Sequence, residues 1–442
     1  MRGYDTIWIY SNENGKGDFS MMKFNIQHYG ALPNGALCTS QIQNAIDDCF
    51  LNGGGEVLIP EGVYLTGGLR LRSGVTLHLL ENAVLSGSTS PEDYMTYIND
   101  SIEPISAEER EMPVSTIKSG ATADRSVYPY SRWNNAIIRA INAKNIAIIG
   151  ERGSEINGQN CFDPEGEENY RGPHAINMWF CENITLRGYT VRDSANWAHA
   201  IQNSQNISIC EVTVLGGHDG FDVRTCDDIL VENCTFTTGD DCIAGFDNIN
   251  VTVRNCYFES SCSIFRFGAT NMLVENCRGI APATYGFRGH LSYEEKRERA
   301  ATTVKCRHSC HGVFLYYCDN RAAVRKTPGN ILIRNCKFKN PDAILTHPFG
   351  HKWCCNRALD NITFENCIFD GICDPMNLEC PKEEPLALYM KYCTVVGREG
   401  YEDINFIVGN NIATVDLDHI LFENLQGPKI VCDPNTKINI KK

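Results

Sequence analysis

The sequence contains no hydrophobic run that approaches the about 18 apolar residues of a membrane-spanning helix. Its first residues, MRGYDTIWIYSNENGKGDFSMMKF, also lack the apolar core of a secretory signal. Positive charge is scarce, because the 40 Lys and Arg residues are scattered and the formal net charge is −14. Nucleic-acid binding needs a concentrated basic surface, so the composition speaks against that class. We therefore expect a cytoplasmic protein that binds neither a membrane nor a nucleic acid.

The 22 cysteines are spread along the chain, without the two clean C-x-x-C pairs of a structural zinc site. A chain of 442 residues with 43% hydrophobic residues has an ample core and does not need a disulfide framework. We therefore expect reduced, buried thiols.

One short sequence unit recurs along the chain and alternates apolar with polar residues. Four intervals of 23, 22, 22 and 21 residues separate the units that start at Asn183, Asn206, Asp228, Asn250 and Asn271. The period of two indicates strands with one buried face, and units this short must stack on their neighbours to bury a core. Because no helical pattern separates the strands, the repeat predicts a parallel β-helix.

A cysteine and an asparagine recur within this unit. The cysteine predicts a small apolar side chain stacked inside the coils, with a metal or redox ladder as the alternative. The asparagine predicts hydrogen bonding in turns or in an internal side-chain ladder. The recurring cysteines are Cys210, Cys234, Cys256, Cys277, Cys336 and Cys367.

The repeat predicts a single domain over residues 24–442. Residues 1–23 precede it, either as an arm that contacts a second subunit of a homo-oligomer or as an extended start. The segment SQIQNAIDDCF at 40–50 has apolar residues at helical spacing and predicts a short helix that caps the solenoid. Residues 95–133, 281–310 and 372–402 interrupt the repeat, and such excursions commonly shape a binding site.

Two acidic clusters, DGFDV at 219–223 and GDDCIA at 239–244, occupy almost the same point of successive units. An offset of 21 residues stacks Asp219 on Asp240, at the about 4.8 Å spacing of adjacent strands, with Asp241 facing outward beside Gly220. Three close carboxylates cannot all ionise freely, so at least one keeps a proton and serves as a general acid. An acid beside carboxylates that activate water is the arrangement of an inverting glycosidase. A calcium site and plain turn aspartates are the alternatives.

At these residues the chain resembles the family 28 glycoside hydrolases, the polygalacturonase family. The resemblance extends over about residues 24–440 and includes FNIQHYGALPNG, INGQN and RDSANWAHAIQNSQNISI besides the two acidic motifs. It implies an all-β, right-handed parallel β-helix of the pectin-lyase-like type and no cofactor. It also implies that Asp240 is the general acid, and that Asp219 and Asp241 hold and deprotonate the attacking water.

The chain departs from the family in two places. SSCSIFRFG at 260–268 puts Cys262 where the family has a histidine, and His218, Arg224 or Arg266 is the candidate replacement. The family's Arg-x-Lys pair, which grips the galacturonate carboxylate, is also missing. HGVFLYY at 311–317 puts Phe314 and Tyr316 at those positions, so we expect a neutral or atypical sugar. An alignment that uses Arg325 and Lys326 instead places them too close to the next repeat.

Further aromatic and histidine residues are candidates for substrate contact. Trp197 lies one coil before Asp219 and is expected to wall the cleft, while Tyr285 and His290 are expected to close one end of it. Two groups offer zinc donors, although loop and substrate-contact roles are favoured for them. The first group comprises Cys306, His308, Cys310 and His311, and the second comprises His347, His351, Cys354 and Cys355, with Trp353 between its members.

Together these observations predict a glycosidase that acts by single-displacement inversion on an oligosaccharide or glycoside. A groove closed at one end predicts exo-action. The alternatives are a β-helix lyase, epimerase or glycosyl-transferring enzyme that uses the same carboxylates, for example on a fructan, and a carbohydrate-binding protein without turnover.

Overall fold

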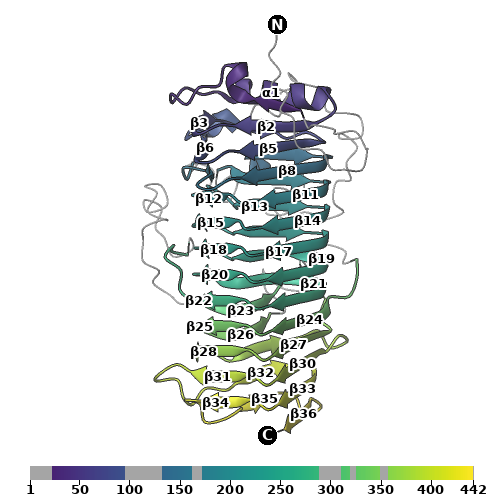
Figure 1. Ribbon diagram of the computed structural model, residues 1–442. Helices are drawn as coiled ribbons and strands as arrows, with labels where there is room; N and C mark the ends of the chain where they lie inside the picture. The colour runs from purple at the N-terminus through teal and green to yellow at the C-terminus, as the bar shows by residue number, and fades with distance from the viewer. Residues whose placement is uncertain are drawn as a thin grey trace, which may run out of the picture.

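The computed structural model describes residues 22–94, 132–161, 172–287, 310–318, 325–348 and 357–441. Its strands pair in parallel, in a 24-stranded and a 12-stranded sheet whose coils stack along one axis. The two ends of the chain lie at opposite ends of the stack (Figure 1). The protein is a right-handed parallel β-helix, as the sequence repeat and the resemblance predict.

Each coil contributes a strand to each of three faces, which we call the first, second and third face. The first face comprises β4 (Leu69–Arg70), β7 (Ala136–Ile141), β10 (His174–Trp179), β13 (His199–Gln202), β16 (Phe221–Arg224), β23 (Cys310–Tyr316), β26 (Pro341–His347), β29 (Met376–Glu379), β32 (Ile407–Asn410) and β35 (Ile430–Val431).

The second face comprises β1 (Lys23–Asn25), β2 (Gly55–Ile59), β5 (Val75–Leu79), β8 (Lys144–Gly150), β11 (Glu182–Arg187), β14 (Gln205–Cys210), β17 (Asp227–Glu232), β24 (Gly329–Arg334), β27 (Asn361–Glu365), β30 (Leu386–Lys391), β33 (Ile412–Asp418) and β36 (Lys437–Lys441). The third face comprises β3 (Gly62–Thr66), β6 (Ala83–Gly87), β9 (Glu155–Asn157), β12 (Thr190–Arg192), β15 (Thr213–Gly216), β18 (Thr235–Thr238), β20 (Tyr257–Ser260), β22 (Arg278–Ile280), β25 (Lys337–Lys339), β28 (Ile368–Ile372), β31 (Thr394–Gly397) and β34 (Leu421–Glu423).

Two long strands join the first and second faces. β19 (Ile243–Arg254) and β21 (Ser263–Glu275) each continue through the corner, where their pairing shifts register between Gly245 and Asn248. Gly245 has φ of 142°, and a side chain there would collide with the Val223 carbonyl. This corner follows directly on the segment that carries the acidic cluster.

The core fills the space between the three faces. Inward side chains of successive coils stack on one another, and the aromatic pairs Phe236–Phe258 and Phe338–Phe369 have ring centroids 5.6 and 5.8 Å apart. The cysteines belong to this core, and all described cysteines are free thiols, as predicted. Cys210 is the exception among the recurring cysteines, because it ends a strand and is only partly buried. The buried column is Cys234, Cys256, Cys277, Cys336, Cys367 and Cys393.

The recurring asparagines form an exposed side-chain ladder at the start of the second face. Asn183 donates to Asn145 at 2.8 Å and accepts from Asn206 at 3.0 Å, and Asn250 donates to Asp228 at 2.9 Å. These residues have φ between 55° and 59°, the left-handed conformation that asparagine and aspartate adopt more readily than other side chains. The predicted hydrogen bonding in turns and in a ladder is present, but the ladder lies on the surface, whereas an internal ladder was expected.

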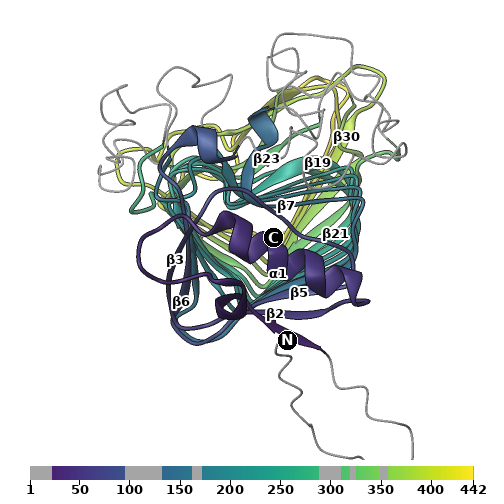
Figure 2. The ribbon, with the colours of Figure 1, turned by 90° about the horizontal axis from the view of Figure 1, so that it is seen from above.

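The predicted capping helix is present as α1 (Thr39–Leu51), which lies across the N-terminal end of the stack (Figure 2). Its Gln43 side chain accepts from the backbone N–H of Arg70 at 2.7 Å and donates to the Arg70 carbonyl at 3.0 Å. The helix thereby pairs polar groups that the first coil would expose at its edge. Three short 3-10 turns accompany it, η1 (Ile26–Tyr29), η2 (Pro91–Tyr94) and η3 (Arg132–Asn134). Within the described ranges, no helix is both long and apolar enough for a transmembrane segment.

One predicted interruption of the repeat is wrong. Residues 372–402 contain strands β29, β30 and β31 and continue the regular coils. Their prolines and most of their charged residues lie between the strands, so composition was a poor guide to an excursion there. Most of the other two interruptions, and residues 1–21 of the predicted arm, lie outside the described residues.

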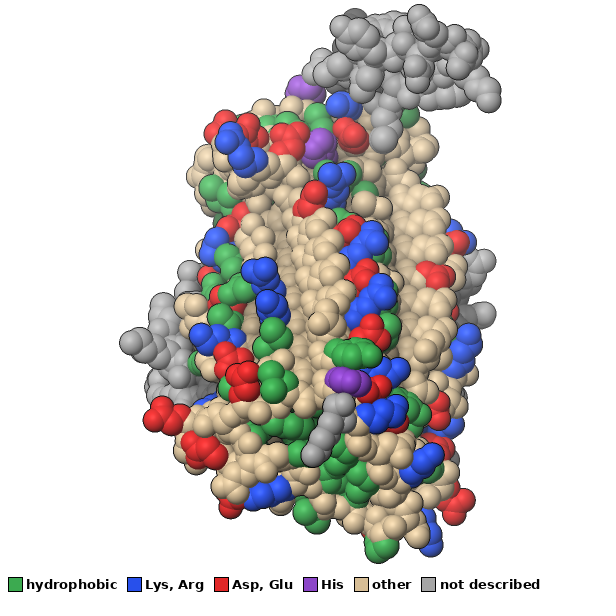
Figure 3. All heavy atoms as spheres, turned by 60° about the horizontal axis from the view of Figure 1, so that its bottom comes forward, with side chains coloured by type: hydrophobic (Ala, Val, Ile, Leu, Met, Phe, Trp, Pro, Cys, Tyr) green, Lys and Arg blue, Asp and Glu red, His purple; other side chains and the backbone are tan. Residues whose placement is uncertain are grey.

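Charged side chains of both signs are interspersed on the face seen in Figure 3. Several ion pairs join neighbouring coils, including Arg187–Glu211 at 3.0 Å and Arg334–Glu275 at 2.7 Å. Opposite charges on successive coils favour the observed register, although exposed pairs of this kind contribute at most about 1 kcal/mol each.

Candidate active site

The acidic residues lie at the turn that leads into the first face. Phe221 pairs with Ile243, and the Gly220 N–H donates to the Asp241 carbonyl at 3.0 Å. The coil-to-coil offset is therefore 22 residues, and the expected stacking of Asp219 on Asp240 is wrong. Extended back along the turn, this register sets Asp219 beside Asp241 and His218 beside Asp240.

The same one-residue correction changes which side chains face outward. Phe221 and Val223 point into the core, whereas Asp222 and Ala244 pair on the outer side. Because strand side chains alternate, a slip of one residue exchanges the two faces. Asp222 lies on the same outward side as Gly220 and joins the acidic cluster through Arg266, although it is not among the site residues predicted from the sequence. Its signal was available in the motif DGFDV, in which it lies between two apolar residues.

Arg266 lies at the centre of the acidic cluster. Its Nε is 2.5 Å from Asp241 Oδ2, and its Nη2 is 3.5 Å from Asp219 Oδ2 and 3.6 Å from Asp222 Oδ2. The guanidinium also covers the ring of Tyr317, with Cζ 4.7 Å from the ring centroid. One cation thus holds three carboxylates in a fixed arrangement on the outer side of the first face.

A second arginine, Arg224 at the end of β16, supports this arrangement. Arg224 donates to both oxygens of Asp222, from Nε at 2.7 Å and from Nη2 at 3.0 Å. Its guanidinium lies over the Trp197 ring, with Cζ 4.5 Å from the centroid. This bidentate geometry fixes the Asp222 side chain, so Arg224 and Asp222 form the floor below the reactive groups.

Burial and like charges act together on Asp219, whose side chain is only 3% exposed. Burial raises the pKa of Asp219 well above its usual value, and the charges of Asp240 and Asp241 raise it further, while Arg266 opposes them. From the sequence, repulsion alone is expected to hold a proton in the cluster. Desolvation is the larger cause, because the carboxyl lies within the folded turn and away from water.

Asp240 differs from its neighbours in being partly exposed. Its backbone carbonyl accepts hydrogen bonds from Thr238 Oγ1 at 2.8 Å and Ser260 Oγ at 2.9 Å, which fix the turn around it. Its Oδ1 accepts from the Asp241 N–H at 3.1 Å. Of the three predicted catalytic carboxylates, Asp240 is therefore the one most open to a ligand from solvent.

Cys262 lies one coil beyond Asp240, where the resemblance places a histidine. Ligand atoms of Asp240, Asp241 and Cys262 lie within 4.8 Å of one another, so the three could surround a metal ion. The guanidinium of Arg266 already occupies Asp241, however, and its fixed positive charge opposes a divalent cation. The donor set therefore suits proton chemistry better than metal binding.

His218 and Trp197 border the cluster on its N-terminal side. Trp197 makes an edge contact with Trp133, whose ring centroid is 6.0 Å away, and a tilted contact with His174 at 5.2 Å. Trp133 and Trp197 pack on Ala200, the outward residue of the coil before Asp222. These aromatic rings fill the first face beside the acidic cluster, and we call Trp133 and Trp197 the aromatic wall.

Three predicted substrate-contact residues are instead core residues. Phe314 and Tyr316 point inward from β23, where Phe314 stacks on Phe265 with centroids 5.9 Å apart. His347 is fully buried against Tyr316, and its two ring nitrogens bond the Glu379 carbonyl and the Leu359 N–H. The outward residues of that strand are Leu315 and Tyr317, because the assumed alternation was again displaced by one residue.

The remaining candidates have mixed outcomes. Tyr285 is 9% exposed, and its carbonyl accepts from Ser261 Oγ at 2.6 Å, so its segment lies beside Asp240. Arg325 bonds Asp227 and Asp247 and is engaged in structure. With both nitrogens of His347 engaged, the second zinc group loses one of its donors. His290, His351 and Trp353, together with Cys306, His308, Cys354 and Cys355, lie outside the described residues.

The fold and the site together define a parallel β-helix protein with an acidic cluster on its outer wall. This class of protein includes carbohydrate-active enzymes. A family model, Glycosyl hydrolases family 28, matches residues 109–276. This match agrees with the resemblance to the family 28 glycoside hydrolases that the sequence motifs indicate.

Two curated relatives are similar to about half of the chain. The chain is 26% identical over 249 residues to the exo-poly-alpha-D-galacturonosidase of Dickeya chrysanthemi, a match that covers 50% of this chain and 41% of the relative. It is 26% identical over 239 residues to a probable polygalacturonase of Vitis vinifera, covering 50% and 44%. The chain thus spans less than half the length of these curated relatives.

Solved structures show the same fold. The family 28 exopolygalacturonase of Yersinia enterocolitica superimposes with a TM-score of 0.64 at 16% identity, covering 95% of this chain and 79% of that chain. PfbA, a surface adhesin of Streptococcus pneumoniae, superimposes with a TM-score of 0.60 at 15% identity, covering 92% and 91%. Because an adhesin shares the fold, the fold alone does not establish catalysis.

Proposed function

We propose that the protein is a glycoside hydrolase that cleaves a glycosidic bond with inversion at the anomeric carbon. The carrying observation is the cluster in which Asp219 and Asp241 both contact Arg266 while Asp240 lies close to these two carboxylates. The family 28 match over residues 109–276 supports the same chemistry. Asp240 protonates the departing oxygen, while Asp219 and Asp241 hold the attacking water.

The electrostatics suit this division of roles. A carboxylate with a raised pKa is a stronger base, so Asp219 is matched to accepting a proton from water. Arg266 fixes the Asp241 side chain through its contact at 2.5 Å, so that Asp241 orients the water. Asp240, the more exposed carboxyl, supplies the proton to the leaving sugar. The attacking water loses its proton to Asp219 as the new bond forms and the glycosidic bond breaks.

The substrate that we propose is a neutral or atypical oligosaccharide. A uronate bound at this site needs a cation for its carboxylate, because an unpaired buried carboxylate is strongly disfavoured. The outward positions after Arg266 are Leu315 and Thr346, neither of which is cationic. Arg224 and Arg266 themselves are engaged by Asp222 and Asp241.

We propose exo-action, with the chain end of the substrate beside the aromatic wall. Trp133 and Trp197 occupy the first face directly before the coil of Asp219, where a longer saccharide would continue. This differs from the expected closure by Tyr285 and His290, which concerned another side of the site.

The test is a panel of neutral and acidic oligosaccharides incubated with the wild-type protein and its Asp240→Asn variant. We expect hydrolysis of a neutral substrate by the wild type, release of single terminal units, and inversion seen by NMR at the first-formed anomeric centre. Retention of configuration, or unsaturated, isomerised or cyclic products, would reject the proposed reaction. Binding without turnover by both proteins would identify a carbohydrate-binding protein instead.

A further inference from the structure

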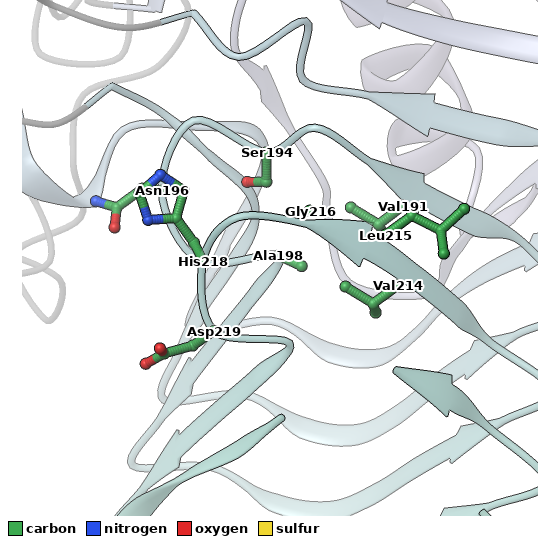
Figure 4. A pocket seen from close by; sticks show the side chains of 9 residues that line it. All are labelled: Val191, Ser194, Asn196, Ala198, Val214, Leu215, Gly216, His218 and Asp219. Atoms are coloured by element: carbon green, nitrogen blue, oxygen red, sulfur yellow. The ribbon is translucent and has the colours of Figure 1, made fainter. Parts of the chain in front are cut away.

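A pocket opens next to the acidic cluster on its N-terminal side. Figure 4 shows Asn196, His218 and Asp219 extending to the same side of the backbone. Its remaining lining is apolar or small. The pocket is lined by Val191, Ser194, Asn196, Ala198, Val214, Leu215, Gly216, His218 and Asp219.

The Asn196 side chain is fully buried, yet among the residues that the structure describes neither its Oδ1 nor its Nδ2 has a hydrogen-bond partner. Its backbone is held in place, because the Asn196 N–H donates to the Pro173 carbonyl at 3.1 Å. Leaving a buried amide unpaired costs about 1–3 kcal/mol for each group. In contrast, the exposed asparagines of the ladder on the second face are paired with one another. An amide left unpaired at this position is therefore available to a ligand.

Asn196 stands in register with the catalytic residues. The coil offsets place it beside His218, and His218 beside Asp240, so it lies two coils, or about 10 Å, before the proposed general acid. It also directly precedes Trp197 of the aromatic wall. A sugar unit whose glycosidic oxygen meets Asp240 thus extends its opposite end towards Asn196.

The chemistry of the lining selects the kind of group that Asn196 meets. An amide offers both a donor and an acceptor, which a sugar hydroxyl matches in both senses. Among the described lining residues there is no Lys or Arg, and Asp219 borders the pocket, so a carboxylate there finds no cation among them and faces a like charge.

We propose that Asn196 binds a hydroxyl of the terminal, uncharged sugar unit and so determines which chain ends are cleaved. This inference rests on the proposed glycosidase function and deepens it. The aromatic wall ends the groove, and Asn196 recognises the sugar hydroxyl that arrives beside it.

The test measures binding separately from turnover. In the Asp240→Asn background, binding of the methyl glycosides of galactose, glucose, xylose and rhamnose is compared with that of methyl galacturonoside by calorimetry. We expect at least one neutral probe to bind more tightly than the acidic one. Adding Asn196→Ala is expected to weaken that binding about tenfold, the loss of roughly one to two hydrogen bonds.

Two further variants keep the test decisive. Asn196→Asp preserves the side-chain shape and retains the acceptor, so it weakens neutral probes less than Asn196→Ala and lowers binding of the acidic probe further. Gln205→Ala removes an exposed amide from β14 and is expected to leave binding unchanged. Melting temperatures of all variants establish that each is folded.

Each outcome of these binding measurements either supports or overturns the proposed role of Asn196. Unchanged affinity in Asn196→Ala, tighter binding of the acidic probe, or no binding of any neutral probe overturns the inference. Active wild-type enzyme with an unaffected Asn196→Ala variant overturns this inference alone and leaves the hydrolase proposal standing. Asn196-dependent binding without hydrolysis by the wild type supports the inference and refutes the hydrolase proposal.

Discussion

Replacing Asp219 by asparagine should stabilise the protein at neutral pH while it abolishes or greatly reduces turnover. Asp219 lies in a cluster of four carboxylates, with Asp222, Asp240 and Asp241, that faces two guanidinium groups. An ionised Asp219 must bear the desolvation of its buried carboxylate and the repulsion of its neighbours. Asparagine has nearly the same shape and removes both unfavourable contributions.

The sign of the pH dependence follows from the direction of the shift. The pKa of Asp219 is raised in the folded state, so folding is favoured below the unfolded-state pKa and this contribution is lost as the pH rises through the folded-state pKa. Each unit of elevation corresponds to about 1.4 kcal/mol. The advantage of Asp219→Asn should therefore be absent near pH 4, grow as the pH rises, and then become constant.

Chemical denaturation at a series of pH values provides the assay, because small shifts are poorly resolved thermally in a chain of this size. With about 2.1 cal/mol/K of unfolding entropy per residue, 442 residues convert 1 kcal/mol into only about 1 °C. Asp228→Asn, in the exposed asparagine ladder, serves as a matched control without a buried carboxylate. Equal or lower stability of Asp219→Asn at pH 7.5, or a gain independent of pH, would refute the reasoning.

Three further predictions follow from the site and the core. Asp240→Asn should lower kcat by about 10² to 10⁴, the usual contribution of a general acid, with little change in KM; an unaffected kcat would remove Asp240 from that role. Arg266→Met should lower the free energy of unfolding by about 3–5 kcal/mol, because it leaves buried carboxylates unpaired, and Arg266→Lys should restore only part of it. Urea titration measures the free energy of unfolding of both Arg266 variants. An Arg266→Met variant as stable as the wild type would contradict the network. Phe314→Ala should cost about 3–5 kcal/mol while KM of the folded enzyme stays unchanged; a raised KM would return Phe314 to the substrate face.

The architecture was largely predictable from the sequence because it depends on local regularities repeated many times. Alternation within a unit indicates a strand, and recurrence at 21 to 23 residues indicates stacking, so occasional errors do not change the conclusion. The asparagine ladder and most of the cysteine column followed in the same way. The excursion predicted over 372–402 failed because it rested on composition rather than on the period.

The arrangement of the acidic cluster required the tertiary structure. Its three predicted aspartates come from two adjacent coils, but whether Asp219 stands beside Asp240 or Asp241 depends on an offset of 21 or 22 residues. Turns vary by one residue without disturbing the repeat, and a shift of one residue exchanges inward and outward side chains. A displacement of one residue turned Phe314 into an apparent substrate contact. Asp222 already lay on the outward side of the expected alternation and was simply not assigned to the cluster.

The sequence by itself determined a stack of short strands and the presence of carboxylates on adjacent coils of that stack. Both follow from a local pattern that repeats along the chain. Only the folded chain decided which acids meet Arg266, how deeply Asp219 is buried and that the Asn196 side chain has no hydrogen-bond partner in the described part of the chain. These properties depend on the three-dimensional surroundings of each side chain, which segments far apart in the sequence contribute together.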